Sequence, residues 1–417
     1  MSELKKHKLG DLGFFFGGVT SIKPEDYGFG TPFLPYKNVY KNSKVNVNEL
    51  ELMNVRPLDL DRRSAIYGDI FFTASSETPD EVAMSSVLLD NVENLTFNGF
   101  CKRFRLNNFK TLLPEYARYL FRDVSFRREV YQLATGDIRF NISQESLANI
   151  EIEIPDIKTQ REIAQILTTL DDKIELNLQM NQTLEAMAQA VFKEWFVDFK
   201  FPGFDGELVD GLPKGWRMGV LGEMVDKLSK GTTPTQKDLG SLEVQIPFLK
   251  VKDISDIGTI SKNNLELIPI EVHQNQLKRS ILETNDILFS IAGTIGRVAI
   301  VDETLNFSNC NQAIAFIRLS DKNAFLEYIH LWLRSEAVQN NIKSSIVQGV
   351  QANVSLTVLN NIEVLIPNDE TLCEWNNLIK PIYHRIRTTI YQIESLTQTR
   401  DTLLPKLISG KMRLNCD

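Results

Sequence analysis

The chain has 417 residues, of which 43% are hydrophobic and 24% charged, and its formal net charge is −8. This composition excludes a disordered or fibrous chain, and the length allows two or three domains. No run of about 20 apolar residues predicts a membrane span, and Asp11 interrupts the apolar run that a signal peptide needs. The four cysteines form no C-x-x-C pair, which argues against a zinc site or a disulfide framework and favours a reducing cytoplasm. The acidic balance argues against a uniformly basic nucleic-acid-binding protein.

Residues 1–155 carry short strand patterns separated by turn signals. Residues 69–73 and 97–106 are predicted strands, and residues 115–133 have the spacing of a helix. The sequence IEIEIP at 150–155 alternates with a period of two until a proline ends it. The mixture predicts an α+β domain with a mostly antiparallel sheet.

Residues 156–200 are predicted to form a long helix whose apolar residues recur at alternating spacings of three and four, as in the seam of a coiled coil. Thr159 and Glu162 have the spacing of a capping box at its start. Asn177 and Asn181 also fall on the seam, where they either fix the register of a helix pair or face solvent where the pair separates. The apolar seam residues are Ile163, Leu167, Leu170, Ile174 and Leu184.

Residues 201–216 contain four Gly and two Pro and are predicted to be a linker. After the linker, the pattern of the first 200 residues repeats at an offset of about 212 residues. Residues 217–367 repeat the strand-rich domain, residues 368–410 repeat the helix, and residues 411–417 form a tail. Pro381 is expected to kink the second helix or to end its first segment. The second seam contains Ile379, Ile382, Ile386, Ile393 and Leu396.

Two matching seams in one chain bury each other only if the helices pair. Because each helix follows its own domain and the linker is short, the pair is expected to be antiparallel. The predicted fold class is therefore α+β, with two duplicated domains separated by two long antiparallel coiled-coil helices and related by a pseudo-twofold internal repeat. The seam spans about 37 residues, which corresponds to a spacer of roughly 55 Å.

Motifs of catalysis are absent from the sequence, which has neither a phosphate-binding loop nor a nucleophile elbow. Pro155-Asp156 followed by Asp171-Asp172-Lys173 loosely matches a pattern of metal-dependent nucleases. The second element lies in the middle of the predicted helix, however, about two dozen Å from the first. We therefore predict no catalytic residue, no metal site and no enzyme activity in this chain by itself.

Two similar domains held at a fixed distance fit a bipartite DNA site. Base edges are read by Arg, Lys, Asn and Gln side chains on loops, and two pairs of repeat-equivalent loops carry such groups: 135–141 with 348–353, and 17–21 with 230–235. For the two asparagines a purely local role, capping the next turn through Ser143 and Ser355, stays open. The basic clusters, 102–105 and 118–128 among them, have a solvated surface as their alternative. The candidate DNA-binding residues are Thr20, Arg139, Asn141, Lys230, Thr232, Thr233, Lys250, Lys252, Arg297, Gln351 and Asn353.

Four short motifs carry a resemblance to a known family: L-P-x-G-W at 212–216, the repeated strand ends IEIEIP and IEVLIP running into the two helices, EWFVDF at 194–199, and LLPKLISG at 403–410. With these motifs the chain resembles, over nearly its full length, the specificity subunits of type I restriction-modification systems. The resemblance implies two target-recognition domains that each read one half of a bipartite site in double-stranded DNA. It implies that the helices set the spacing and dock two methylation subunits.

The resemblance also implies restriction subunits as further partners. S-adenosylmethionine, ATP and magnesium are then cofactors of the partner subunits, and none is expected in this chain. The alternative that the residues leave open is a coiled-coil interaction scaffold without DNA binding.

Overall fold

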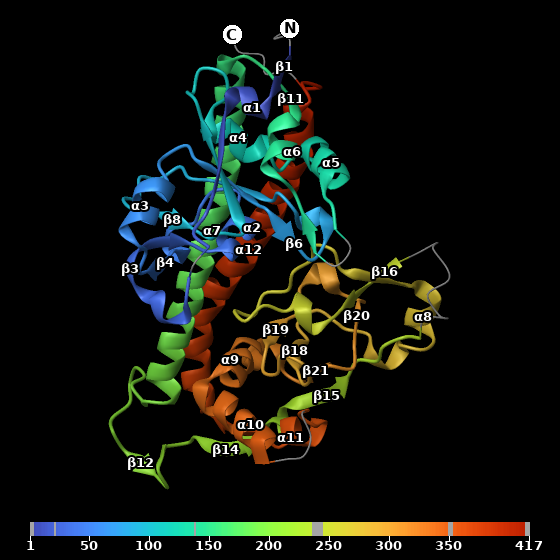
Figure 1. The fold of residues 1–417 in the computed structure, drawn as a ribbon. Helices are drawn as coiled ribbons and strands as arrows, with labels where there is room; N and C mark the ends of the chain where they lie inside the picture. The colour runs from blue at the N-terminus through green and yellow to red at the C-terminus, as the bar shows by residue number, and fades with distance from the viewer. Residues whose placement is uncertain (1–3, 21, 137–138, 236–244, 349–352, 413–417) are drawn as a thin grey trace. The chain divides into compact units, whose positions relative to one another are not determined.

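The computed structural model describes residues 4–20, 22–136, 139–235, 245–348 and 353–412 (Figure 1). The chain divides into two compact units, one formed by Met1–Leu176 with Gln392–Asp417 and the other by Asn177–Tyr391. Two long helices, α7 (Ile157–Phe196) and α12 (Asp369–Ile408), each contribute one segment to each unit.

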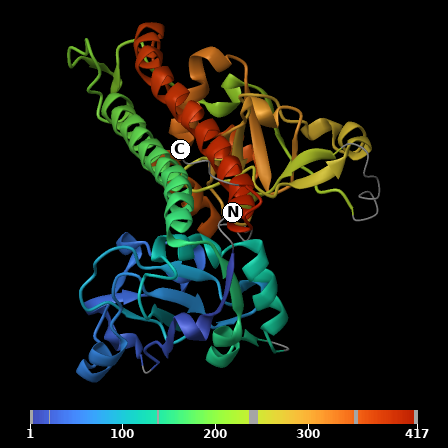
Figure 2. The ribbon, with the colours of Figure 1, turned by 90° about the horizontal axis from the view of Figure 1, so that it is seen from above.

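The domain of the first unit is built on two main sheets, besides two pairs of short strands. The larger sheet is antiparallel, in the order β2 (Gly13–Gly17), β9 (Cys101–Leu106), β5 (Ile70–Thr73) and β7 (Ser85–Val87). The smaller sheet places β3 (Tyr27–Leu34) between β4 (Glu51–Met53) and β8 (Thr96–Phe97), and β3 runs parallel to β8. All of β5 is buried, so this strand lies at the centre of the domain, and short helices lie around the strands, which are blue to cyan in Figure 2.

The domain of the second unit repeats this topology strand for strand. Its larger sheet has the order β15 (Val225–Lys230), β21 (Ile314–Leu319), β18 (Ile287–Ser290) and β19 (Val298–Ile300). Its smaller sheet places β16 (Gln245–Leu249) between β17 (Glu266–Pro269) and β20 (Asn309–Cys310), again with one parallel pair. The predicted mixture of helices with mostly antiparallel strands is therefore confirmed in both halves.

Each domain pairs its first strand with its last. In the first unit β1 (Lys5–Lys8) pairs with β11 (Glu151–Ile154), and in the second β14 (Arg217–Val220) pairs with β22 (Glu363–Ile366). His7 lies opposite Ile152 and Gly219 lies opposite Val364, so both members of the pair are shifted by 212 positions. The predicted internal repeat is confirmed at the level of strand register.

Short helices and hairpins complete the two units. In the first they are α1 (Leu9–Leu12), α2 (Tyr36–Lys41), α3 (Pro57–Arg63), β6 (Ser75–Ser76), the 3-10 turn η3 (Pro79–Glu81), α4 (Pro114–Leu120), α5 (Val124–Leu133), β10 (Phe140–Asn141) and α6 (Gln144–Asn149). In the second they are β12 (Leu208–Val209), β13 (Leu212–Pro213), η4 (Leu221–Met224), η6 (Val251–Asp253), α8 (Ile270–Gln274), η8 (Glu303–Leu305), α9 (Lys322–Arg334), α10 (Glu336–Gln348) and α11 (Leu356–Asn360).

Two elements predicted as continuous are interrupted in the structure. The strand predicted at 97–106 is divided between β8 and β9, which belong to different sheets, because Asn98 makes a turn in which its side chain accepts the Phe100 N–H at 2.8 Å. The helix predicted at 115–133 is divided into α4 and α5. The carboxylate of Asp123 caps α5 by accepting the Ser125 N–H at 2.9 Å, so a new helix starts there.

The residues that cap the long helices lie three positions before the threonines Thr159 and Thr371. Asp156 accepts the Thr159 N–H at 2.9 Å, and Asn368 accepts the Thr371 N–H at 2.9 Å. The capping box predicted at Thr159 is therefore wrong, because the threonine N–H groups are bonded to the preceding Asp and Asn side chains. The two capping residues are again 212 positions apart, since 368 − 156 = 212.

Pro381 does not end the second helix, since α12 continues from Asp369 to Ile408. The expectation that the proline ends the first helical segment is thus wrong. Ile379 and Tyr383, on either side of Pro381, are buried in the core of the second unit, and their packing offsets the hydrogen bond that the proline cannot donate.

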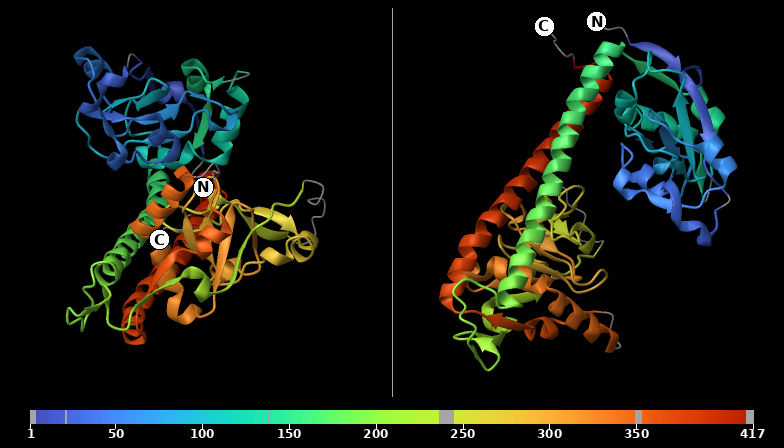
Figure 3. Two further views of the ribbon diagram at one scale, coloured as in Figure 1. Left: turned by 90° about the horizontal axis from the view of Figure 1, so that it is seen from below. Right: turned by 90° about the vertical axis from the view of Figure 1, so that its left-hand side faces the viewer.

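The two helices run antiparallel within each unit. In the first unit Ile163 and Leu167 share a core with Leu407 near the end of α12. Figure 3 shows the start of the green helix beside the end of the red one. In the second unit Trp195 of α7 lies 5.8 Å from Trp375 of α12, measured between ring centroids. The predicted fold class of two duplicated α+β domains with two long antiparallel helices is confirmed.

None of the predicted seam residues is exposed. Asn177 and Asn181 are 0% and 4% exposed, so the alternative in which they face solvent is wrong. Of the apolar seam residues, Ile163, Leu167, Ile379 and Ile386 are buried, and Leu170, Ile174, Leu184, Ile382, Ile393 and Leu396 are half-buried.

The segment predicted as a linker carries a short hairpin of β12 and β13 and packs on the second unit at both of its ends. The ring of Trp216 is stacked on Phe201 at 4.8 Å and meets Phe196 at 5.5 Å, between centroids. Within the described part of the chain, no helix has the length and apolar character needed to cross a membrane.

Candidate nucleic-acid interface

In each domain the first candidate loop contains a glycine where the backbone passes very close to a second backbone segment. A Cβ atom on Gly18 would lie 2.2 Å from the carbonyl oxygen of Asn98, and one on Gly231 would lie 2.0 Å from that of Cys310. Both positions therefore require glycine. Beyond these crossings Thr20 is exposed in the first domain, as are Lys230, Thr232 and Thr233 in the second.

The second pair of candidate loops leads into the short helices α6 and α11. The hydroxyl of Ser143 accepts the Ser146 N–H at 2.9 Å, and the hydroxyl of Ser355 accepts the Val358 N–H at 3.2 Å. The serines are thus the caps. The Asn141 amide donates to the Arg139 carbonyl oxygen at 3.0 Å and shapes its own turn, whereas Asn353 is exposed. Gln351 lies outside the described residues.

Backbone hydrogen bonds bring the two loops of each domain together. In the first domain the Ile142 N–H donates to the Ala74 carbonyl oxygen at 3.1 Å. The Ala74 N–H in turn donates to the Phe100 carbonyl oxygen at 2.8 Å. A Cβ atom on Gly99 would lie 2.7 Å from the Thr20 methyl carbon. Thr20, Phe100, Arg139 and Asn141 therefore come from one edge of this domain, although only three of them were predicted.

The second domain repeats these bonds with different residues. Val354 N–H donates to the Ile291 carbonyl oxygen at 2.9 Å, and Ile291 N–H donates to that of Ala313 at 2.8 Å. The Thr233 hydroxyl is hydrogen-bonded to the side chain of Gln312, a residue that sequence reasoning missed. Gln312 directly follows the Cys310-Asn311 crossing, and the strand pairing of that crossing is not visible in the sequence.

Several predicted basic residues are engaged within the second domain. Lys250 forms an ion pair with Glu266. Arg297 donates to Asp256 at 2.8 Å and to the Val251 carbonyl oxygen at 3.2 Å. Lys252 is exposed. Arg297 thus has a structural role within this domain.

Three arginines of the basic clusters in the first domain bind groups within the first unit, whereas Arg128 is exposed. Arg105 binds Asp69, and Arg118 binds Asp171 at 2.7 Å. Arg122 donates to four backbone carbonyl oxygens, and its burial lowers its pKa to about 10. The expectation of a solvated surface is wrong for these three arginines, because their guanidinium groups replace water as hydrogen-bond donors in the core.

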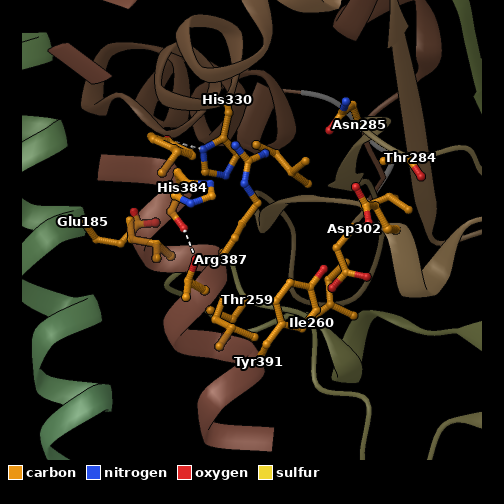
Figure 4. Close-up of a pocket in the computed structure, with 18 residues that line it drawn as sticks. Glu185, Thr259, Ile260, Thr284, Asn285, Asp302, His330, His384, Arg387 and Tyr391 are labelled. Atoms are coloured by element: carbon orange, nitrogen blue, oxygen red, sulfur yellow. Dashed lines mark hydrogen bonds between the residues drawn. The ribbon is translucent and has the colours of Figure 1, made fainter. Parts of the chain in front are cut away.

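A cavity of about 400 Å³ in the second unit lies between α12 and the loops around Thr259, Asn285 and Asp302 (Figure 4). At its wall His330 Nδ1 lies 2.7 Å from the hydroxyl of Tyr383. Burial lowers the pKa of His330 well below its usual value, so the ring is neutral.

Three ion pairs lie at or beside this cavity. Arg334 binds Glu185 at 2.5 Å, Lys262 binds Asp302 at 2.7 Å, and Arg387 lies 3.5 Å from Glu327. In the first unit the positions matching His330 and Tyr383 hold Arg118 and Asp171, 212 positions earlier in both cases. The His330–Tyr383 contact in the cavity wall therefore has the same position in the second unit as the Arg118–Asp171 ion pair in the first, and both are structural contacts.

The loop edges offer hydroxyl, amide and guanidinium groups, which form hydrogen bonds with base edges and phosphates. Among the described residues, no group of three His, Cys, Asp or Glu side chains is arranged to hold a metal ion. Duplicated scaffolds with differing polar loops define a modular recognition protein.

Comparison with known proteins identifies the family. The model of the type I restriction modification DNA specificity domain matches residues 1–186 and 213–403, and the chain belongs to this family. The MjaIX specificity subunit of Methanocaldococcus jannaschii is 27% identical over 98% of this chain and 93% of its own length. The HindI specificity subunit of Haemophilus influenzae is 25% identical over 99% of this chain and 100% of its own length.

The fold is also similar to that of the S subunit from M. genitalium. The TM-score is 0.58, with 15% sequence identity over 97% of this chain and 96% of that one. This likeness concerns the fold alone.

Proposed function

We propose that this chain is the DNA-specificity subunit of a type I restriction-modification complex, and that each domain reads one half of a bipartite site. The observation that carries the proposal is a scaffold built twice with different loop side chains. The bonds through Ala74 and Ile291 match in the two domains, whereas the neighbouring loops carry Arg139 and Asn141 in one and Gln312 and Asn353 in the other. Matched frames with unlike polar groups suit two different half-sites.

The long helices are the second part of the proposal. Each has 40 residues, and we propose that together they set the distance between half-sites and dock two methylation subunits, with restriction subunits joining the complex. Leu178, Met187 and Leu378 are apolar helix residues left 40%, 50% and 43% exposed, as a docking surface requires. S-adenosylmethionine, ATP and magnesium act in the partner subunits, in the cytoplasm, and this chain supplies recognition without catalysis.

Methylation sequencing tests the proposal directly. A host lacking adenine methylation would express this chain with its methylation subunit, and a second culture would express the methylation subunit alone. We expect a new methylated adenine motif in two halves with a fixed gap, present only with this chain. Absence of any new motif, while the same methylation subunit is active with another specificity subunit, would contradict the proposal and favour an interaction scaffold.

A further inference from the structure

A cavity of about 330 Å³ opens at the loop edge of the first domain. Tyr36 and Tyr40 line it with parallel rings whose centroids are 6.5 Å apart, and Phe100 lines it with 57% of its surface exposed. Arg139 lies at the same cavity and is exposed, and its guanidinium makes no hydrogen bond or ion pair with any residue in the described ranges. The cavity therefore combines aromatic surfaces with an available cation.

The polar side of the cavity is the carboxylate of Glu81. One oxygen accepts the Tyr40 hydroxyl at 2.9 Å, and the other accepts the Ser76 hydroxyl at 2.6 Å. The bond from Ser76, followed by that from Tyr40, lowers the pKa of Glu81, so the group is ionised at neutral pH. The Thr78 side chain contributes a third hydrogen bond, and because a carboxylate has about four acceptor positions, one remains for a ligand.

The hydrogen bonds of the second domain identify the equivalent positions there. In the first domain the Thr73 hydroxyl donates to the Glu81 carbonyl oxygen and accepts the Met84 N–H. In the second domain the Ser290 hydroxyl donates to the Thr294 carbonyl oxygen and accepts the Arg297 N–H. Glu81 thus corresponds to Thr294. Phe100 corresponds to Ala313 for the same reason. The Phe100 carbonyl oxygen accepts the Ala74 N–H, and the Ala313 carbonyl oxygen accepts the equivalent Ile291 N–H.

The second domain lacks the groups that make this cavity. Ser75 and Ser76 directly follow Ala74, and their counterparts after Ile291 are Ala292 and Gly293. Neither a carboxylate nor an aromatic ring occupies the positions of Glu81 and Phe100. The aromatic and acidic cavity is therefore a property of the first domain alone and not a requirement of the shared fold.

These groups match the chemistry of an unpaired nucleobase. Aromatic side chains stack on any base, a carboxylate accepts hydrogen from exocyclic amino groups, and an arginine beside the opening binds phosphate. A base that stays stacked in the duplex cannot enter a concave site, so the base must leave the stack. Thymine has no amino group, and two carbonyl oxygens flank its ring N–H and would repel the Glu81 carboxylate.

We infer that the Tyr36–Phe100–Glu81 cavity receives one unstacked, amino-bearing base of the DNA site and thereby contributes to the specificity of the first domain. This inference rests on the proposed DNA-recognition function. It assigns a base-binding role to Tyr36, Glu81 and Phe100, none of which the sequence motifs indicate.

The test uses the full chain with its methylation subunit and duplexes that contain the mapped bipartite site. Each position of the site outside the methylated adenines would be replaced in turn by 2-aminopurine, whose fluorescence rises when it unstacks. We expect one position to brighten on binding, and this signal to be lost in Phe100→Ala and reduced in Glu81→Gln. The affinity of Phe100→Ala should fall roughly 5- to 150-fold, the value of one base–aromatic stack.

Phe307→Ala in the second domain is the matched control, since Phe307 is 61% exposed, and it should retain the signal. A complex that binds and methylates the site without any signal sensitive to Phe100→Ala would overturn the inference while leaving the proposed function intact. Weakened subunit assembly in Phe100→Ala with unchanged fluorescence would also overturn it and indicate a cationic side chain of a partner as the occupant. Failure of the wild-type complex to recognise any bipartite site would instead refute the proposed function.

Discussion

Arg105 donates two parallel hydrogen bonds to Asp69, at 2.8 and 2.7 Å, and Arg318 repeats this arrangement with Asp286 at 2.9 and 2.8 Å. Both carboxylates are fully buried, and each also accepts a backbone N–H at 2.8 Å. The pairs join β9 to the turn before β5, and β21 to the turn before β18. A bidentate pair of this kind fixes the strand order in both domains.

Asp69→Asn should therefore destabilise the first unit. The substitution leaves a guanidinium with an uncompensated charge, and we expect a loss of about 3 kcal/mol, the lower end for a buried pair because Arg105 keeps one third of its side chain exposed. Chemical denaturation of the full chain measures the change. Glu153→Gln breaks the exposed Lys6–Glu153 pair, and it is the control, with an expected change below about 1 kcal/mol. Equal effects of the two substitutions would contradict the structural role of Asp69.

The caps of the long helices should differ in their response to pH. Asp156→Ala and Asn368→Ala should each cost about 1 kcal/mol at pH 7, because each removes the acceptor for a helical N–H. The Thr159 N–H lowers the pKa of Asp156. The ionised cap is therefore stabilising above the unfolded pKa of about 3.9, and this contribution is lost as the pH falls through the lower folded value.

Unfolding free energies between pH 7 and pH 3 test this difference. The gap between wild type and Asp156→Ala should narrow at the acidic end, whereas the gap for Asn368→Ala should stay constant because an amide does not titrate. A constant gap for both variants would mean that the charge of Asp156 has no part in capping.

His330 should make the second unit sensitive to mild acid. The pKa of His330 is lowered in the folded chain. Below the unfolded pKa of about 6.5, His330 therefore binds a proton in the unfolded chain but stays neutral in the folded chain. Stability should fall with decreasing pH by up to about 1.4 kcal/mol per pH unit. Thermal unfolding of wild type and His330→Gln between pH 7.5 and pH 5 measures this slope, which should be smaller in the variant. An identical slope in both proteins would place the proton uptake elsewhere.

The length of the helices should set the gap between half-sites. Insertion of four residues in both helices, beside Asn177 and beside Thr389, adds about 6 Å of helix, close to two base pairs. This prediction rests on the proposed function and is read by methylation sequencing. We expect a longer gap with each half-site unchanged. An altered half-site with the original gap would refute the role of the helices as a spacer.

The repeat, the long helices and the strands β5 and β11 could be predicted because their signals are local or recur along the chain. The capping role of Asp156 and Asn368 was missed, since an Asp or Asn and a Thr three residues later offer competing caps in the sequence. The loop edge was predicted only in part. Phe100 and Gln312 reach it through hydrogen bonds and strand crossings between segments far apart in sequence, and single-sequence patterns do not show which strands pair. The inward arginines were missed for the same reason, because their acidic partners are distant in sequence.

The first unit takes its last helical segment from the far end of the chain, with Leu407 and Ile408 buried beside Ile163. The ribosome must therefore add the 215 residues from Asn177 to Tyr391 (391 − 176) before this core can close. At about 5–20 residues per second, that interval is roughly 10 to 40 s. During synthesis the apolar side of α7 stays exposed to solvent until the end of α12 has been made. In a chain truncated before Gln392 it would stay exposed permanently. Because transiently exposed apolar surface promotes aggregation, we expect the nascent chain to depend on chaperones until both ends of the polypeptide have completed the first unit.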